Sequence, residues 1–256
     1  HWHDAYICPN FCCQKVTPGG IVKKKYSYLL CLFLLSSTYS QDTNSKSVSL
    51  TNQTTTENKN YPSNPWNDII GSSELDIKRS GMGESLMSNL VCDAMLTRTE
   101  TDFAFISYGE LYADLYNGNI TRLDMFRLSP FNRTLVVLEI DGQFLKQIIE
   151  KNLGVVQSGL AIAGGKVEYD PGRPSQNRLT YFQVGDHPLY PKKDYRVVTI
   201  DYLADGFTGF DMLKEIDQAH VFKTGILLRE TLSEYIQQNS PLNQYKVRLD
   251  NRWLKK

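Results

Sequence analysis

The sequence holds 256 residues, of which 41% are hydrophobic and 11% aromatic, so it carries enough apolar surface to form the core of one or two domains. Its 28 lysines and arginines balance its 28 aspartates and glutamates, and a net charge of zero argues against nucleic acid or an anionic membrane surface as the main partner. Four of the five cysteines lie in the first 31 residues, which excludes a disulfide scaffold for the rest of the chain.

The first 65 residues divide into three segments outside the folded body. Residues 1–22 show no periodic pattern, and we interpret them as a non-native upstream extension. Residues 23–40 begin with three lysines, continue with an apolar stretch over 26–37 and end in small residues, which is the pattern of a secretory signal peptide. Residues 41–65 are mostly Ser, Thr, Asn and Gln, a composition typical of a disordered polar linker.

Two other interpretations of these segments are weaker. The apolar stretch is shorter than the roughly 20 residues that a membrane span requires, so we expect no stable membrane anchor, and a buried hydrophobic helix is the alternative. The histidines and cysteines near the N-terminus are zinc-ligand types, but their spacing matches no zinc-binding pattern. We therefore predict no metal site there.

The folded body, expected over residues 66–256, begins with alternating helical and extended patterns. Apolar residues at helical spacing predict a helix over 84–98, with Cys92 as a buried structural thiol on its apolar side. A strand over 102–107, a short helix over 121–126 and a β-branched strand over 134–140 follow. Asp141 and Gly142 then turn the chain into a second amphipathic helix that closes near Gly154.

The second half of the body is richer in strands. Short strands over 159–163, 165–169 and 177–183 are separated by Gly and Asp-Pro-Gly turns, and we expect them to form a meander. A strand over 195–200, a short helix over 210–215 and a C-terminal helix whose apolar face includes Leu228 and Ile236 complete the pattern. The sequence therefore predicts an α+β fold in which a mixed sheet packs with helices in layers.

The order of several short segments resembles the C-terminal domain of the 5'-nucleotidase family, over roughly residues 84–236. The matching pieces are SNLVCDAM (88–95), ADL (113–115) leading to GNIT (118–121), PF (130–131) entering TLVVLEI (134–140), YDP (169–171) and DYLA (201–204). Members of this family are secreted or periplasmic enzymes that remove phosphate from nucleotides. The resemblance implies a 5'-nucleotidase C-terminal-domain-like fold and a role in nucleotide catabolism.

The resemblance assigns hydrolysis to another domain. In the family, a separate N-terminal metallophosphatase domain holds two metal ions on His, Asp and Asn ligands. Residues 41–256 contain only His187 and His220 and no Gly-Asn-His segment. We therefore expect no catalytic residues, metal or cofactor in this chain, and hydrolysis only with a metallophosphatase subunit as partner. Whether the chain counts as an enzyme by itself is left open.

Phe131 and Tyr202 match by position the two aromatic residues that sandwich the base in the family. A ring on each face of a base contributes about 1–3 kcal/mol per stack, and Tyr serves as well as Phe because both present a π-face. Ordinary core packing is the alternative for both residues.

The phosphate side departs from the family pattern. Tyr112 stands where the resemblance places an arginine, Thr208 stands where it places an acidic ligand, and Glu110 adds a negative charge. A phenol cannot replace the bidentate, permanently charged contact that a guanidinium makes with phosphate. Arg133 is the candidate substitute cation, and an exposed arginine at a strand end is the other interpretation. We predict that recognition of the base survives while recognition of the phosphate weakens.

These inferences combine into one leading hypothesis. The chain is expected to be an exported, periplasmic or extracellular 5'-nucleotidase C-terminal domain that binds a nucleotide or nucleoside through Phe131, Tyr202, Arg133, Tyr112 and Thr208. The alternative is a degenerate interaction module that has kept the fold without ligand binding, and a truncated gene product is the third possibility.

Overall fold

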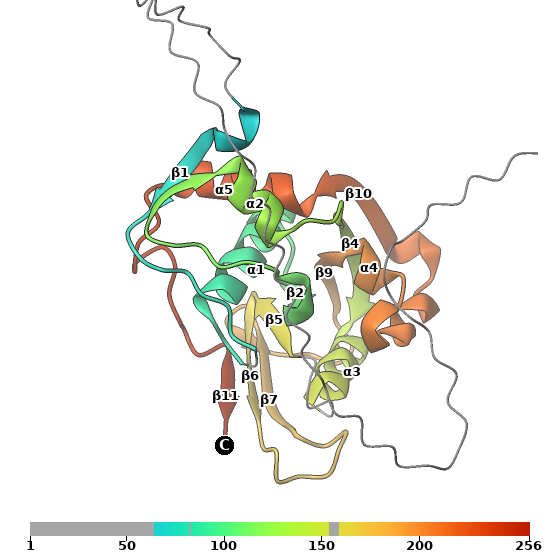
Figure 1. Ribbon diagram of the computed structural model, residues 1–256. Coiled ribbons are helices and arrows are strands. Elements are labelled where there is room, and N and C mark those ends of the chain that lie inside the picture. The colour runs from blue at the N-terminus through green and yellow to red at the C-terminus, as the bar shows by residue number, and fades with distance from the viewer. Residues whose placement is uncertain (1–63, 82, 154–158) are drawn as a thin grey trace, which may run out of the picture. The chain divides into compact units, whose positions relative to one another are not determined.

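The structure is a computed structural model that describes residues 64–81, 83–153 and 159–256 (Figure 1). The predicted upstream extension, the signal peptide and the linker up to residue 63 lie outside these residues. Within the described part of the chain, no helix combines the length and apolar character that crossing a bilayer requires.

A five-stranded mixed sheet forms the centre of the domain. Its strand order is β10-β4-β9-β2-β5, with bounds β2 (Phe103–Ser107), β4 (Thr134–Asp141), β5 (Leu160–Ala163), β9 (Asp194–Ile200) and β10 (Val221–Leu227). Strand β9 pairs antiparallel with β4 and parallel with β2, so the sheet is mixed as predicted. Every residue of β2 is buried, and its sequence FAFIS accordingly shows no alternation of apolar and polar residues.

Three longer helices cover this sheet. Helix α1 (Leu86–Thr99) packs against β2 and β5, α5 (Leu228–Asn239) packs against α1, and α3 (Gly142–Leu153) packs against β4 and β7. Figure 1 shows α1 and α5 towards the upper left and α3 below β4 and β9. Ser85 caps α1 reciprocally with Ser88, which fixes the start of the helix. The short helix α2 (Arg122–Leu128) precedes β4 in the chain, and the short helix α4 (Asp201–Ala204) packs against β4.

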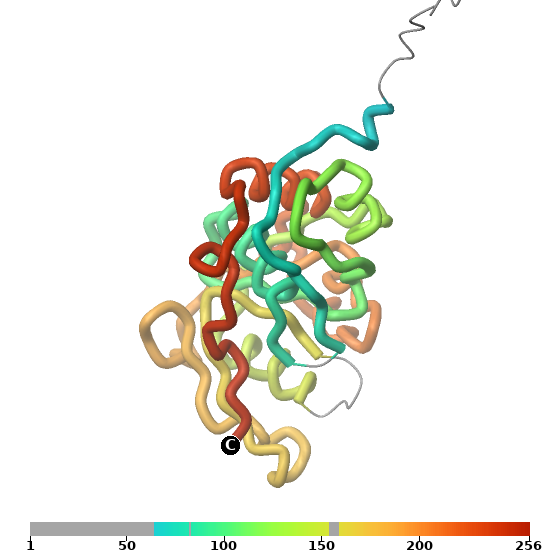
Figure 2. The backbone as a smooth tube through the Cα atoms, turned by 60° about the vertical axis from the view of Figure 1, so that its left-hand side comes forward, coloured from blue at the N-terminus to red at the C-terminus, as the bar shows by residue number. Residues whose placement is uncertain are grey.

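Two smaller sheets complete the described fold. Strands β11 (Trp253–Lys255), β6 (Gly165–Tyr169), β7 (Leu179–Val184) and β8 (His187–Pro188) form one, and β1 (Ile69–Ser73) pairs with β3 (Gly118–Thr121) in the other. Figure 2 shows the C-terminal segment running beside the hairpin of β6 and β7. The layered α+β architecture predicted from the sequence is confirmed.

The predicted meander is wrong, because β5 and β6 belong to different sheets. Gly164 and Gly165 connect them where other backbone passes very close. A Cβ on Gly164 would lie 2.3 Å from the carbonyl oxygen of Asp102, and one on Gly165 would lie 2.1 Å from that of Gln183. Gly164 also has a positive φ of 81°. The glycines that looked like a hairpin turn instead let the chain cross from one sheet to the other.

Other differences from prediction are smaller. The predicted helix over 210–215 is a 3₁₀ helix, Asp211–Glu215. Cys92 is fully buried in α1, and burial raises the pKa of its thiol well above the ordinary value, so the prediction of a buried thiol is confirmed.

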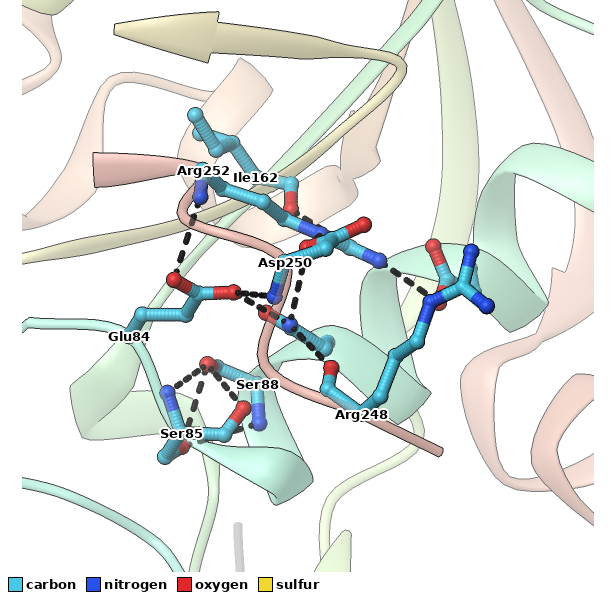
Figure 3. A network of polar contacts seen from close by, with 9 residues as sticks. Glu84, Ser85, Ser88, Ile162, Arg248, Asp250 and Arg252 are labelled. Atoms are coloured by element: carbon cyan, nitrogen blue, oxygen red, sulfur yellow. Dashed lines mark hydrogen bonds and ion pairs between the residues drawn. The ribbon is translucent and has the colours of Figure 1, made fainter. Parts of the chain in front are cut away.

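A polar network holds the C-terminal tail against α1 (Figure 3). The Glu84 carboxylate accepts hydrogen bonds from the backbone N–H of Asp250 at 2.9 Å and of Arg252 at 3.0 Å. The buried Arg252 guanidinium contacts Asp93 and Asp250, both at 2.8 Å, and donates to the carbonyl oxygen of Ile162 at 2.9 Å. These bonds place the residues before β11 so that the strand can pair with β6.

Candidate functional site

The antiparallel pairing of β4 and β9 brings the candidate site residues together. Leu135, near the start of β4, lies opposite Ile200, the last residue of β9. The loop that carries Phe131 and Arg133 enters β4, and Tyr202 follows directly after β9. Residues about 70 positions apart in the sequence therefore meet at one end of the sheet, as the register of an antiparallel pair requires.

Asp201 links the two strands at this point. One oxygen of its carboxylate accepts hydrogen bonds from the backbone N–H of Thr134 at 3.1 Å and from the Thr134 hydroxyl at 2.8 Å. The other oxygen accepts from the backbone N–H of Tyr202 at 2.7 Å. This carboxylate fixes the first turn of α4, and with it the position of Tyr202 relative to β4.

Phe131 and Tyr202 both contact one planar group, the guanidinium of Arg133. The central carbon of that guanidinium lies 3.9 Å from the ring centre of Tyr202 and 4.9 Å from the ring centre of Phe131. Both contacts are cation–π interactions. Phe131 is 48% exposed, so it does not belong to the buried core, and Tyr202 is partly buried against it. We call the space between these two rings the aromatic slot.

Glu110 holds Arg133 in the slot. It lies in the 3₁₀ helix Tyr108–Glu110 that follows β2, and its carboxylate is only 5% exposed. The Nε–H of Arg133 donates to its Oε2 at 2.8 Å. The Arg133 side chain is 20% exposed, so it is not a freely exposed arginine at a strand end.

Two further aromatic rings support the slot. Tyr112 meets Phe131 edge to face, with ring centres 5.4 Å apart and an interplanar angle of 72°. Burial, and then the nearby Glu110 charge, raise the pKa of the Tyr112 phenol, so it is neutral and can donate a hydrogen bond. Phe207 stacks flat on Tyr202, with centres 4.5 Å apart and planes within 3°. A ring and a guanidinium at these distances cannot share one face of Tyr202, so they cover opposite faces.

Thr208 lies on the turn beyond this group. Its side chain is exposed, and its hydroxyl donates to the carbonyl oxygen of Phe207 at 2.8 Å. Its φ of 53° is left-handed, which is uncommon for a β-branched residue. Four of the five predicted site residues, namely Phe131, Arg133, Tyr202 and Tyr112, thus form one connected cluster, and Thr208 touches it only through Phe207.

Sequence reasoning did not assign site roles to Phe207 and to the pairing of Glu110 with Arg133. A signal for Phe207 was available, since this large aromatic residue directly precedes Thr208, which the resemblance places at the ligand. An aromatic ring at this position needs an apolar surface to pack against, and the face of Tyr202 that Arg133 does not cover provides it.

A cavity of about 560 Å³ lies elsewhere, along α3, and it contains none of the predicted site residues. It is lined by Gln143, Lys146, Gln147, Glu150, Lys151, Gln176 and Met212. Among the residues described by the structure, no group of three or more His, Cys, Asp and Glu side chains gathers where it could hold a metal ion. We therefore take the aromatic slot as the candidate site, because the predicted side chains converge there and none of them lines the cavity along α3.

Comparisons with known proteins show which family the chain belongs to. A family model described as "5'-nucleotidase, C-terminal domain" matches residues 54–215. A 5'-nucleotidase-related protein of Glossina morsitans morsitans is 28% identical over 202 residues, which cover 68% of this chain and 36% of that protein. The silent protein UshA(0) of Salmonella typhimurium is 26% identical over 179 residues, covering 68% and 31%. The chain thus spans about a third of the length of these curated relatives.

Solved structures give the same result. A 5'-nucleotidase precursor from Thermus thermophilus is 27% identical with a TM-score of 0.66, and the match covers 73% of this chain and 39% of that one. The NAD nucleotidase of Haemophilus influenzae has the same TM-score of 0.66 at 18% identity over 75% of this chain and 39% of that one, which shows a shared fold. Because the family model covers more than half of the residues, this chain belongs to the 5'-nucleotidase C-terminal domain family.

Proposed function

We propose that this chain is a nucleoside- or nucleotide-recognition domain that holds the base in the aromatic slot between Phe131 and Tyr202. The observation that carries the proposal is that both rings already contact the same planar group, the Arg133 guanidinium, at 4.9 Å and 3.9 Å. A purine base is also a planar group that stacks between two rings, and aromatic stacking contributes about 1–3 kcal/mol per base.

Hydrolysis in nucleotide catabolism is then supplied by a metallophosphatase domain, on a partner subunit or on a longer form of this chain. The resemblance places the metal ligands of the family in that domain, and residues 41–256 hold only two histidines. The chain alone is expected to release no phosphate from AMP in the presence of divalent metal. Metal-dependent turnover by a homogeneous sample would contradict this division of labour.

Export is part of the same proposal. The lysines and apolar stretch of residues 23–40 support a cleaved signal peptide and a periplasmic or extracellular destination. N-terminal sequencing of secreted protein should begin near Gln41, and a mature product that keeps Cys8, Cys12 and Cys13 would refute it.

Calorimetric titration with adenosine and AMP tests the slot itself. Phe131→Ala should reduce nucleoside affinity by about 1–3 kcal/mol because one stacking face is lost. Phe222→Ala is the matched control, since Phe222 is similarly exposed at 46% but lies on β10. Equal weakening of binding by both variants, or no binding of any nucleoside to the unchanged protein, would favour the alternative of a degenerate interaction module.

The same titration tests the phosphate side. Tyr112 packs against Phe131 and Thr208 is turned to its own backbone, and neither carries a charge that attracts phosphate. AMP should therefore bind only slightly better than adenosine. AMP binding far tighter than adenosine would mean that a phosphate site lies elsewhere.

A further inference from the structure

The guanidinium that fills the aromatic slot is paired with a buried carboxylate, and this pairing restricts which ligand can take its place. This step rests on the proposed function, because it concerns which base enters the same slot. The N–H bonds of a guanidinium lie in its plane. The Glu110 oxygen that accepts from Arg133 Nε at 2.8 Å therefore lies at the edge of the slot, close to the plane of the group held between the rings.

A base can enter the slot only if Arg133 leaves it. Departure of Arg133 would leave the Glu110 carboxylate, only 5% exposed, without the N–H donor that pairs with it in the structure. An unpaired buried charge is strongly unfavourable, and the free energy lost with the Glu110–Arg133 pair offsets much of the free energy gained from stacking. A ligand that binds well must therefore bring its own N–H donors to the edge where the Glu110 carboxylate lies.

Guanine is the base that meets this demand. Its ring N1–H and its 2-amino group form a planar pair of donors on one edge, and this pair matches a carboxylate in the same forked way as an arginine does. Adenine offers its amino group next to the lone pair of N1, which a carboxylate repels. Hypoxanthine keeps N1–H but lacks the 2-amino donor. We propose that the slot selects guanine nucleosides, with Glu110 as the residue that determines base specificity and Arg133 as its occupant when no ligand is bound.

Calorimetric titration of the full chain with guanosine, inosine and adenosine tests this proposal. Guanosine should bind at least about tenfold tighter than either of the others, because hydrogen bonds to a charged group are among the stronger ones. Inosine differs from guanosine only by the 2-amino group, so this comparison needs no change in the protein.

Variants then identify the carboxylate. Glu110→Gln should lower guanosine affinity about tenfold and leave adenosine affinity no weaker than before. Glu139→Gln is the control, since Glu139 is a partly exposed glutamate of β4 that faces His220 at 3.5 Å, away from the slot residues. It should leave the ranking of the three nucleosides unchanged.

The possible failures are distinguishable. Equal affinities for guanosine, inosine and adenosine would overturn guanine selection and leave the aromatic slot as a nucleoside site. Binding of N-methylguanidinium without binding of guanosine would overturn it as well, because the slot would then accept only a cation. No binding of any nucleoside to the unchanged chain would overturn both this inference and the proposed function.

Discussion

Tyr202 owes its position to Asp201 on one side and to stacked groups on its two faces. The Asp201 carboxylate ties the backbone N–H of Tyr202 to Thr134 of β4 through three hydrogen bonds of 2.7 to 3.1 Å. Arg133 and Phe207 then cover the two faces of the ring. One slot wall is thus held by the main chain of the sheet, whereas Phe131, on an exposed loop, forms the other.

Replacing Asp201 by asparagine should loosen that wall. The amide nitrogen of Asp201→Asn cannot accept a hydrogen bond, so either Thr134 or Tyr202 is left with an unpaired donor. We expect a loss of about 1–3 kcal/mol in the free energy of unfolding, measured by urea denaturation, together with weaker nucleoside binding. Asp205→Asn, at an exposed position just beyond α4, is the control and should change stability little. Equal stability of Asp201→Asn and the unchanged protein would contradict the role given to this carboxylate.

The sequence allowed the slot to be predicted only in part. Phe131 and Tyr202 stood at positions that the family resemblance marks, and the register of β4 and β9 brings them together. The contact between Glu110 and Arg133 was not predictable, because it joins segments 23 residues apart through a fold that no local pattern specifies. Glu110 therefore looked like a charge that repels phosphate, whereas in the structure it is half of a buried ion pair.

The C-terminal strand β11 pairs with β6, and the polar network around Arg252 holds the residues that precede it. Arg252 is 8% exposed and bridges Asp93 of α1 and Asp250 of the tail. Burial of the guanidinium opposes its charge, but the two carboxylates more than compensate, and the pKa of Arg252 is raised.

Truncation of Arg252 should therefore be severe. Arg252→Ala removes the partner of two carboxylates and of the Ile162 carbonyl, and breaking a buried ion pair from one side costs about 3–5 kcal/mol of unfolding free energy. Lys255→Ala is the matched control, because Lys255 lies in β11 itself and its side chain is exposed. Thermal or urea unfolding measures both variants. Similar losses for the two would show that the tail as a whole, and not the Arg252 network, provides the stability.

Elements with strong periodic patterns or clear turn boundaries were predicted well, including the short strands β5 and β6, whereas several other short or exposed strands were not predicted. Helices α1, α3 and α5 and strands β2, β4 and β9 lie within a few residues of their expected bounds, because each buries an apolar face. Strands β1, β3, β8 and β11 have five residues or fewer, and β10 contains Gly225 with a φ of 71° and an irregular register. Strands β1, β3, β10 and β11 pair with strands that are distant in sequence, and β8 has only two residues, so no local alternation predicted them.

Acid should destabilise the domain through a few carboxylates with lowered pKa values. The backbone N–H of Asn117 and the ammonium of Lys78 lower the pKa of Asp76 below its ordinary value of 3.8. Burial alone would raise the pKa of Asp114, but hydrogen bonds from Arg79 outweigh it and hold the pKa below 3.8. The stability that such groups contribute is present above their unfolded pKa and is lost as the pH falls through the folded one.

Asp250 behaves in the same way, because Arg252 outweighs its burial and keeps its pKa low. Asp93 opposes the trend, since burial raises its pKa above 3.8 despite the contact with Arg252. The free energy of unfolding should change little between about pH 7 and 5, and it should decrease once the pH is lower than about 3.8. Urea denaturation across this range measures it, and Asp114→Asn should flatten the acid slope. A variant with the same slope as the unchanged protein would show that Asp114 does not share in the loss.

The contacts of a bound nucleoside test the central claim most directly. Intermolecular nuclear Overhauser effects between guanosine and the protein report which side chains touch the base. The aromatic slot predicts contacts from the base proton H8 and the ribose H1′ to the ring protons of both Phe131 and Tyr202. Contacts confined to residues of the cavity along α3, such as Gln143 and Met212, with none to either ring, would contradict it.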